Sequence, residues 1–141
     1  MKCGKKRIGK NILKISQMKV FDYNITEQAV KIKTLTPVVA KQNTSDGKTV
    51  YYAPDDVMFL KRIREDFENK FLEIFGEAPD SSVDILPSGK SKKFVTCYKG
   101  LWITAYHGTF QLCGKPEYLN FLYNTGIGAK NSQGFGMFEV V

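Results

Sequence analysis

Four glycines and one lysine near the end of the chain form the stretch best suited to chemistry. It reads Gly126-Ile-Gly128-Ala-Lys130-Asn-Ser-Gln-Gly134-Phe-Gly136, so two glycine-apolar-glycine steps flank a polar segment. Glycine reaches positive φ without a steric penalty and lets a second backbone come close. Successive exposed N–H groups in such a loop form a concavity for anions, and Lys130 adds positive charge at its centre. The stretch therefore predicts a loop that binds phosphate.

Two common nucleotide-binding motifs do not fit this loop. A dinucleotide fingerprint places G-x-G-x-x-G after a strand and before a helix. Here Asn131 stands at the third glycine position, and the pattern predicts a helix before the loop and a strand after it. The Walker A pattern G-x-x-x-x-G-K-[ST] is absent. ATP and NAD are therefore poorly supported as ligands, and we expect no cofactor.

The chain is basic along its length. Its 141 residues, enough for one domain, carry a net charge of +7. This balance favours nucleic acid or another polyanion as partner. Seven Lys or Arg and no acid fall in the first twenty residues, and Lys90, Lys92 and Lys93 follow a Ser-Gly turn. Each cluster fits either contacts to RNA phosphates or a solubilising surface.

The cysteines and the apolar runs bear on where in the cell the protein is located. Cys3, Cys97 and Cys113 are odd in number and lack C-x-x-C spacing, which is typical of reduced thiols in a cytoplasm. With a single histidine in the chain, we expect no metal site. No apolar run reaches membrane-spanning length, and the lysine-rich start lacks the apolar core of a signal peptide. The sequence thus predicts a cytoplasmic protein without a membrane partner.

Elements that could position the loop follow from apolar periodicity. Pro54 is suited to the first turn of a helix, and Gly76 is suited to its end. The residues expected on the apolar face of this helix recur at three- and four-residue steps and are Val57, Leu60, Ile63, Phe67, Phe71 and Ile74. In chain order we expect a strand within 28–40, a hairpin turn at 43–47, that helix, a strand region over 82–98 broken at 87–89, a strand at 101–112, a helix over 116–126 and a last strand at 135–141.

From residue 28 onward this order is strand, helix, strand, strand, helix, strand. It predicts an α+β fold of the ferredoxin-like (RRM-like) β-α-β-β-α-β type with an antiparallel sheet. In the first strand, Val30, Ile32 and Thr34 share one face. Residues 28–141 would form this domain, and residues 1–27 would form a basic N-terminal segment, either a linker or a strand from another domain.

The strand at 101–112 has two apolar faces, whereas a sheet with helices on one side needs only one. The second face is thus expected to have a cover: another domain, a dimer partner, stacked bases, residues 1–27 or the hairpin at 36–52. For the aromatic face, burial under the helices is favoured over base stacking. One face holds Trp102, Tyr106, Phe110 and Leu112, and the other holds Leu101, Ile103 and Ala105.

The full spacing of the glycine stretch is more specific than a phosphate loop. It resembles the signature of the CRISPR-associated endoribonucleases that cut repeat RNA, the sixth Cas family of the RAMP superfamily. Three upstream phrases are similar to that family: Lys33-Thr-Leu-Thr-Pro-Val-Val39, Tyr52-Ala-Pro-Asp-Asp56 and Gly108-Thr-Phe-Gln-Leu112. The resemblance covers residues 28–141 and matches the second of the family's two ferredoxin-like domains.

The resemblance implies metal-independent cleavage of CRISPR repeat RNA. The ribose 2′-hydroxyl attacks the adjacent phosphate and leaves a cyclic phosphate, so a base and a cation are needed. The family's usual base is a histidine in the first domain, whereas the one histidine here is His107. Either His107 is the base, or it is a structural histidine and this chain has little activity alone. Tyr23, Tyr51 or Lys130 could assist by polarising a phosphate.

The resemblance also implies partners: CRISPR repeat RNA, a first ferredoxin-like domain or a homodimer partner, and other CRISPR-associated proteins. Two alternatives stay open, a non-catalytic RNA-binding subunit of a CRISPR effector complex and an enzyme that binds a small phosphate compound. The residues expected to contact RNA are Gly126, Gly128, Lys130, Asn131, Ser132, Gly134, Gly136, Lys90, Lys92 and Lys93, and the catalytic candidate is His107.

Overall fold

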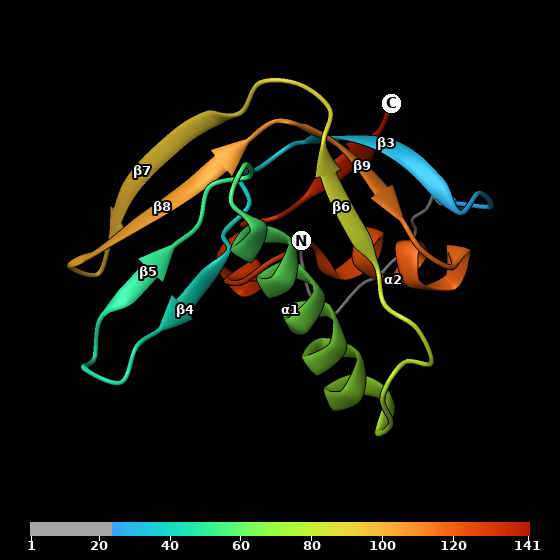
Figure 1. Cartoon of the computed structure of the whole chain (residues 1–141), viewed down its shortest axis with the longest axis horizontal. Coiled ribbons are helices and arrows are strands. Elements are labelled where there is room, and N and C mark those ends of the chain that lie inside the picture. The colour runs from blue at the N-terminus through green and yellow to red at the C-terminus, as the bar shows by residue number, and fades with distance from the viewer. Residues whose placement is uncertain (1–23) are drawn as a thin grey trace, which may run out of the picture.

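The computed structural model describes residues 24–141, so the lysine-rich start, Cys3 and Tyr23 lie outside the described part (Figure 1). Its main sheet has the order β10-β3-β9-β6, and every neighbouring pair is antiparallel. With α1 after β3 and α2 after β9, this is the ferredoxin-like order, which confirms the predicted fold class. The four strands are β3 (Ala29–Thr34), β6 (Asp84–Pro87), β9 (Thr109–Cys113) and β10 (Phe138–Val140), and the helices are α1 (Val57–Phe75) and α2 (Pro116–Thr125).

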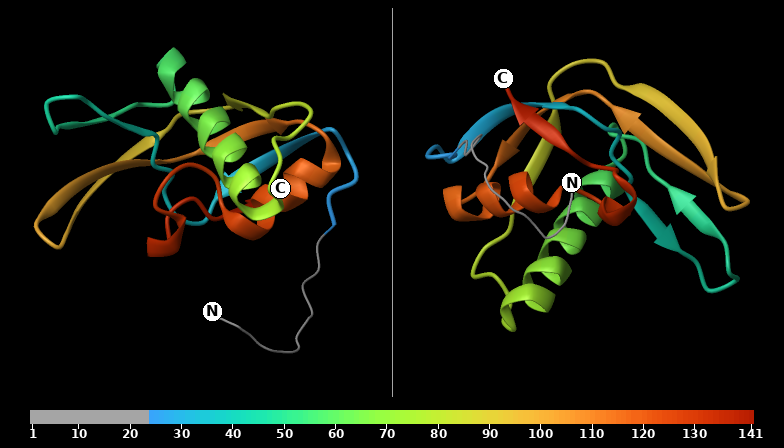
Figure 2. Two further views of the ribbon diagram at one scale, coloured as in Figure 1. Left: turned by 90° about the horizontal axis from the view of Figure 1, so that it is seen from below. Right: turned by 180° about the vertical axis from the view of Figure 1, so that it is seen from behind.

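Both helices cover one face of this sheet, and the core lies between the two layers (Figures 1 and 2). Strand β3 alternates between exposed and buried residues, which confirms the shared face of Val30, Ile32 and Thr34. The rings of Phe59 in α1 and Phe110 in β9 stack with their centroids 5.9 Å apart. The opposite face of the sheet is exposed and carries polar residues such as Lys31, Lys33 and Gln111 together with the exposed Leu86.

Helix α1 begins and ends at capping residues. Asp56 accepts a hydrogen bond from the N–H of Met58 at 2.9 Å, and Gly76 ends the helix with φ 79°. The middle of the predicted face is confirmed, because Ile63 and Phe67 are buried. Its ends are wrong: Val57 is 81% exposed and Ile74 is 56% exposed. The C-terminal end of the helix reaches beyond the sheet in Figure 1, so Ile74 has no sheet to pack on, whereas in the first turn Phe59, and not Val57, faces the sheet.

The strand expected at 101–112 is divided at Gly108 into β8 (Leu101–His107) and β9. Gly108 exchanges hydrogen bonds with Thr34 through its N–H and its carbonyl oxygen. The alternation of buried and exposed residues shifts by one position at this division. Odd-numbered residues, Ile103 and Ala105, are buried before Gly108, and even-numbered residues, Phe110 and Leu112, are buried after it.

This shift explains which aromatic residues are buried. The prediction of burial was right for Phe110 and wrong for Trp102, which is 68% exposed, while Tyr106 is half-buried. Trp102 lies on a two-stranded ribbon of β7 (Lys92–Tyr98) and β8, which extends beyond the main sheet in both figures. No helix lies over that ribbon in Figure 1, so the face that carries Trp102 stays open.

The second apolar face of β8 is covered by the chain itself. Val39, Ile103 and Ala105 form a small separate core, and Tyr51, Ala129 and Phe135 pack against it. Val39 and Tyr51 belong to the segment with the hairpin of β4 (Lys41–Asn43) and β5 (Thr49–Tyr51), and the other two belong to the glycine stretch. Of the covers considered from the sequence, the 36–52 segment is the one seen here. The glycine stretch, which was not expected to cover this face, completes it.

The described chain begins against α2. Ile25 is 1% exposed within the main core, and its N–H and carbonyl oxygen both bond to the side chain of Asn120. The boundary expected at residue 28 stays a prediction.

Candidate functional site

The glycine loop, residues 126–136, is closed by hydrogen bonds across its base. The N–H of Ile127 donates to the carbonyl of Gly136 at 3.0 Å, and the N–H of Gly136 donates to the carbonyl of Pro37 at 2.8 Å. The N–H of Ala129 donates to the carbonyl of Val39 at 2.8 Å. These three N–H groups are therefore not available to an anion, contrary to the expectation of a row of exposed donors.

The glycines make room for close contacts rather than for a ligand. A Cβ on Gly126 or Gly136 would lie 2.8 or 2.7 Å from the amide nitrogen of Asn131, and a Cβ on Gly128 would collide with the carbonyl oxygen of Val39. The Asn131 amide donates to the carbonyls of Ile127 at 3.0 Å and Phe135 at 2.9 Å. Asn131 thus bridges the two arms of the loop.

The polar tip of the loop is what remains accessible. It contains a short 3-10 helix, η1 (Asn131–Gln133), which follows Lys130 in the left-handed region at φ 61°. Lys130 is half-buried, whereas Ser132 and Gly134 are exposed. Of the loop residues predicted to contact RNA, Lys130, Ser132 and Gly134 can therefore reach solvent, and Gly126, Gly128 and Gly136 are buried.

A lysine that the sequence did not single out contacts the loop from α1. The ammonium of Lys70 donates to the carbonyl oxygen of Gly126 at 2.7 Å and to the side-chain oxygen of Asn131 at 2.6 Å. Burial lowers the pKa of Lys70 to about 8, and the carboxylate of Asp66 opposes this shift. The four-residue spacing of Asp66 and Lys70 was the only signal in the sequence.

A second site lies where β8 passes into β9. Lys33, Lys90 and Lys92 line a pocket of about 300 Å³ around His107, together with Thr34, Gly108 and Thr109. Three positive charges and no carboxylate line this pocket, so its chemistry suits an anion. The structure brings together two of the predicted lysines with His107 and adds Lys33, which strand β3 places beside them.

One ring nitrogen of His107 is engaged in this pocket. Its Nδ1 lies 3.1 Å from Oγ1 of Thr34, which also accepts a hydrogen bond from the N–H of Gly108 at 3.1 Å. The ring of Phe94 lies edge-on at 6.2 Å. Nε2 is then the nitrogen left for a proton or a ligand.

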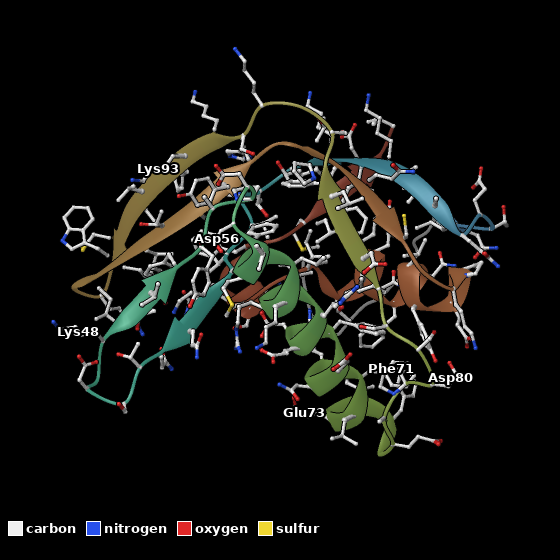
Figure 3. All side chains as sticks on the ribbon, in the orientation of Figure 1. Lys48, Asp56, Phe71, Glu73, Asp80 and Lys93 are labelled. Atoms are coloured by element: carbon white, nitrogen blue, oxygen red, sulfur yellow. The ribbon has the colours of Figure 1, made fainter. Side chains whose placement is uncertain are left out.

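Lys93 does not join this group. In the ribbon, Lys92 pairs with His107, whereas Lys93 pairs with Tyr106, so the two lysines lie on opposite faces. Figure 3 shows Lys93 on β7, well away from Phe71 and Glu73 of α1. The glycine loop contributes no residue to the lining of the His107 pocket.

The described residues hold no group of three or more His, Cys, Asp or Glu that could bind a metal ion. None of the helices in residues 24–141 is long and apolar enough to cross a membrane.

Comparison with known proteins shows the family of this chain. The family model for "CRISPR associated protein Cas6, C-terminal" matches residues 16–140. The chain belongs to the Cas6 family. This result confirms the resemblance seen in the glycine stretch and the upstream phrases.

Two curated Cas6 relatives show how much of the family protein is present. The chain is 32% identical over 108 residues to "CRISPR-associated endoribonuclease Cas6" of Pyrococcus furiosus, covering 76% of this chain and 40% of the relative. It is 25% identical over 137 residues to "CRISPR-associated endoribonuclease Cas6 1" of Methanocaldococcus jannaschii, covering 95% and 53%. The chain thus spans about half the length of the curated relatives or less.

Two solved structures share the fold of this chain. One described as "Characterization of a Cas6-related gene from Pyrococcus furiosus" has a TM-score of 0.74 at 26% identity, covering 92% of this chain and 51% of that one. One described as "An RAMP protein binding different RNA substrates" has a TM-score of 0.75 at 23% identity, covering 92% and 52%.

Proposed function

We propose that this chain binds CRISPR repeat RNA and forms part of an endoribonuclease that processes it. Membership of the Cas6 family supports the substrate class. The observation that carries the proposal is the pocket around His107, where Lys33, Lys90 and Lys92 converge without a carboxylate. Such a pocket suits a phosphate of an RNA backbone.

The RNA contacts would come from two places. The pocket supplies Lys33, Lys90 and Lys92, and the tip of the glycine loop supplies Lys130 and Ser132. Lys93 would contact RNA from the other face of the ribbon. The buried glycines and Asn131 would act by fixing the shape of the loop rather than by touching RNA.

The reaction expected of the complete enzyme needs no metal. A base takes the proton of a ribose 2′-hydroxyl, the 2′-oxygen bonds to the adjacent phosphorus, the bond from phosphorus to the 5′-oxygen breaks, and the 5′-oxygen takes a proton from an acid or from water. The products are a 2′,3′-cyclic phosphate and a 5′-hydroxyl. A lysine beside the phosphate would stabilise the charge that grows on the phosphorane.

His107 could accept the proton only through Nε2, because Nδ1 is engaged with Thr34. The other ionisable side chains that line its pocket are three lysines, and no carboxylate or tyrosine lines it. We therefore propose that the chain alone binds repeat RNA and cuts it slowly or not at all. We further propose that fast cleavage requires a base from a part of the enzyme outside residues 24–141.

The experiment measures binding and cleavage of a repeat RNA hairpin by the 141-residue chain in EDTA. We expect affinity that falls steeply with salt and little cleavage over hours. His107→Ala should change the cleavage rate little. Rapid cleavage in EDTA that is abolished by His107→Ala would instead make His107 the general base. Salt-insensitive or absent RNA binding would contradict the proposal itself.

A second function, RNA binding without catalysis in a CRISPR effector complex, is favoured by the lining of the pocket. Three lysines and one engaged histidine are better suited to hold a phosphate than to move a proton. A first ferredoxin-like domain of a Cas6 relative, added in trans, separates the two functions. Restored cleavage supports the endoribonuclease, and binding without cleavage supports the second function.

A further inference from the structure

Lys70 joins helix α1 to the glycine loop through two short hydrogen bonds. Its ammonium donates to the Gly126 carbonyl at 2.7 Å and to the Asn131 side chain at 2.6 Å. These acceptors lie 56 and 61 residues further along the chain. A hydrogen bond from a charged donor is stronger than one between neutral groups. Lys70 is thus the strongest polar connection between α1 and the loop.

The bond to Asn131 acts on the whole loop. The amide nitrogen of Asn131 donates to Ile127 on one arm and to Phe135 on the other. Lys70 occupies the remaining oxygen of that side chain and thereby fixes the amide in the orientation that makes both contacts. Three hydrogen bonds therefore connect α1 through the Asn131 side chain to both arms of the loop, and the bond from Lys70 to Gly126 is a fourth, direct connection.

The charges around Lys70 come from two elements. On α1, Asp66 lies one turn before it, and Arg62 and Glu65 act on Asp66; Lys41 of β4 acts on Asp66 as well. The loop offers Lys70 only neutral oxygens, those of Gly126 and Asn131. Burial lowers the pKa of Lys70 to about 8, so its charge is retained at neutral pH and lost under mildly alkaline conditions.

We propose that Lys70 is a positioning residue for RNA binding: its ammonium, acting through Asn131, holds the glycine loop in the shape that presents Lys130 and Ser132. Loss of its two hydrogen bonds loosens the loop without unfolding the domain. The inference rests on the proposed function only for its effect on RNA, because the effect on the loop is independent of any ligand.

The test compares Lys70→Met with Lys61→Met, which removes the same charge from an exposed position of the same helix. Hydrogen-exchange protection factors are measured for the loop amides of Ile127, Ala129 and Gly136 and for the amides of β3. In Lys70→Met we expect loop protection to fall roughly tenfold or more, as for loss of a charged hydrogen bond, while β3 is unchanged. Lys61→Met should alter neither.

The pH dependence of the wild-type chain gives a second readout that needs no substitution. Opening of the loop returns Lys70 to water and to its ordinary pKa, so above about pH 8 the open loop binds more protons than the closed one, and protection of the loop amides should rise relative to β3 between pH 8 and pH 9. Lys70→Arg, which keeps its charge throughout this range, should show no such rise. Unchanged loop protection in Lys70→Met, or an equal loss in Lys61→Met, would overturn the proposal.

Binding of repeat RNA at constant ionic strength tests the link to function. We expect Lys70→Met to weaken binding roughly tenfold and Lys61→Met to weaken it no more than about twofold. If the loop loosens while RNA affinity is unchanged, the positioning role in RNA binding is overturned although the loop contact stands. If neither variant nor wild type binds RNA, the proposed function fails, and the exchange data still decide the role of Lys70 in the loop.

Discussion

At the scale of single residues, the spacing of the glycine loop follows from one side chain. Gly126 and Gly136 flank the amide of Asn131, and a Cβ at either position would lie within 2.8 Å of its nitrogen. Gly134 differs, since a Cβ there would meet nothing within 4 Å. Two glycines with similar backbone angles, φ 86° and 96°, thus have different reasons to be glycine.

This difference predicts the outcome of two alanine substitutions. Gly134→Ala should cost about 1 kcal/mol of unfolding free energy, the penalty of a left-handed alanine. Gly136→Ala adds a collision with the Ile127 carbonyl oxygen and displacement of Asn131, so it should cost at least about 3 kcal/mol. Denaturant unfolding of both variants measures the difference, and equal costs would contradict the close packing around Asn131.

The sequence predicted that residues 126–136 form a loop with a dictated path, but it assigned the wrong purpose to most of its N–H groups. The glycine spacing shows where positive φ is tolerated, and it does not show which backbone or side chain comes close. The partners of the loop, Val39 and Lys70, lie far away in the sequence. Only the tertiary fold brings them together.

At the scale of elements, the contact between α1 and the loop links stability to pH. The unfolded chain holds the Lys70 proton up to about pH 10.5, whereas the folded chain releases it near pH 8. Between these values the unfolded state binds more protons, so the contribution of Lys70 to the unfolding free energy rises with pH. Opening of the loop alone follows the same sign, because it too exposes Lys70 to water.

We therefore predict that Lys70→Met removes a rise in unfolding free energy between pH 8 and pH 10.5. Other groups titrate in this range, so the quantity to measure is the difference between wild type and variant at each pH. Lys61→Met serves as the control and should retain the rise. A constant difference between wild type and Lys70→Met across this range would show that Lys70 keeps an ordinary pKa in the folded chain.

Asp66 shifts the pH at which Lys70 loses its proton in the folded chain. Its carboxylate favours the protonated form of Lys70, while burial raises the pKa of Asp66 itself. Asp66→Asn removes the negative charge and should lower the pH at which Lys70 loses its proton, and with it the pH at which protection of the loop amides begins to rise. Hydrogen exchange from pH 6 to pH 9 measures this onset. An onset that does not move, or that shifts to higher pH, would contradict the coupling between the two side chains.

Periodicity predicted the elements and their order but not the division at Gly108. A strand is recognised by its alternation, and the stretch 101–112 alternates well enough to look continuous. The shift at Gly108 depends on its hydrogen bonds with Thr34, which is 74 residues away. The same shift exposes Trp102 and directs His107 toward Lys33, so the pocket could not be foreseen from local pattern.

At the scale of the whole molecule, the lysines divide between two surfaces. The His107 pocket lies where the ribbon joins the main sheet, and Lys33 brings the charge of the open sheet face to it. Lys93 lies on the other face of the ribbon with Tyr106. A path for RNA along the sheet would pass the pocket and leave the outer face of the ribbon to a weaker, peripheral contact.

Adjacent lysines on opposite faces allow this path to be tested. Lys92→Ala should weaken binding of repeat RNA roughly tenfold, the cost of one well-placed charged contact, and Lys93→Ala should weaken it by about threefold or less. Both variants lose the same charge at neighbouring positions of the chain, so any general electrostatic effect is similar in the pair. If Lys92 contacts a phosphate, its loss should also reduce the slope of log affinity against log salt by about 0.7 for single-stranded RNA. A larger loss for Lys93→Ala would place the RNA on the outer face of the ribbon, beside Trp102, and would leave the His107 pocket outside the binding path.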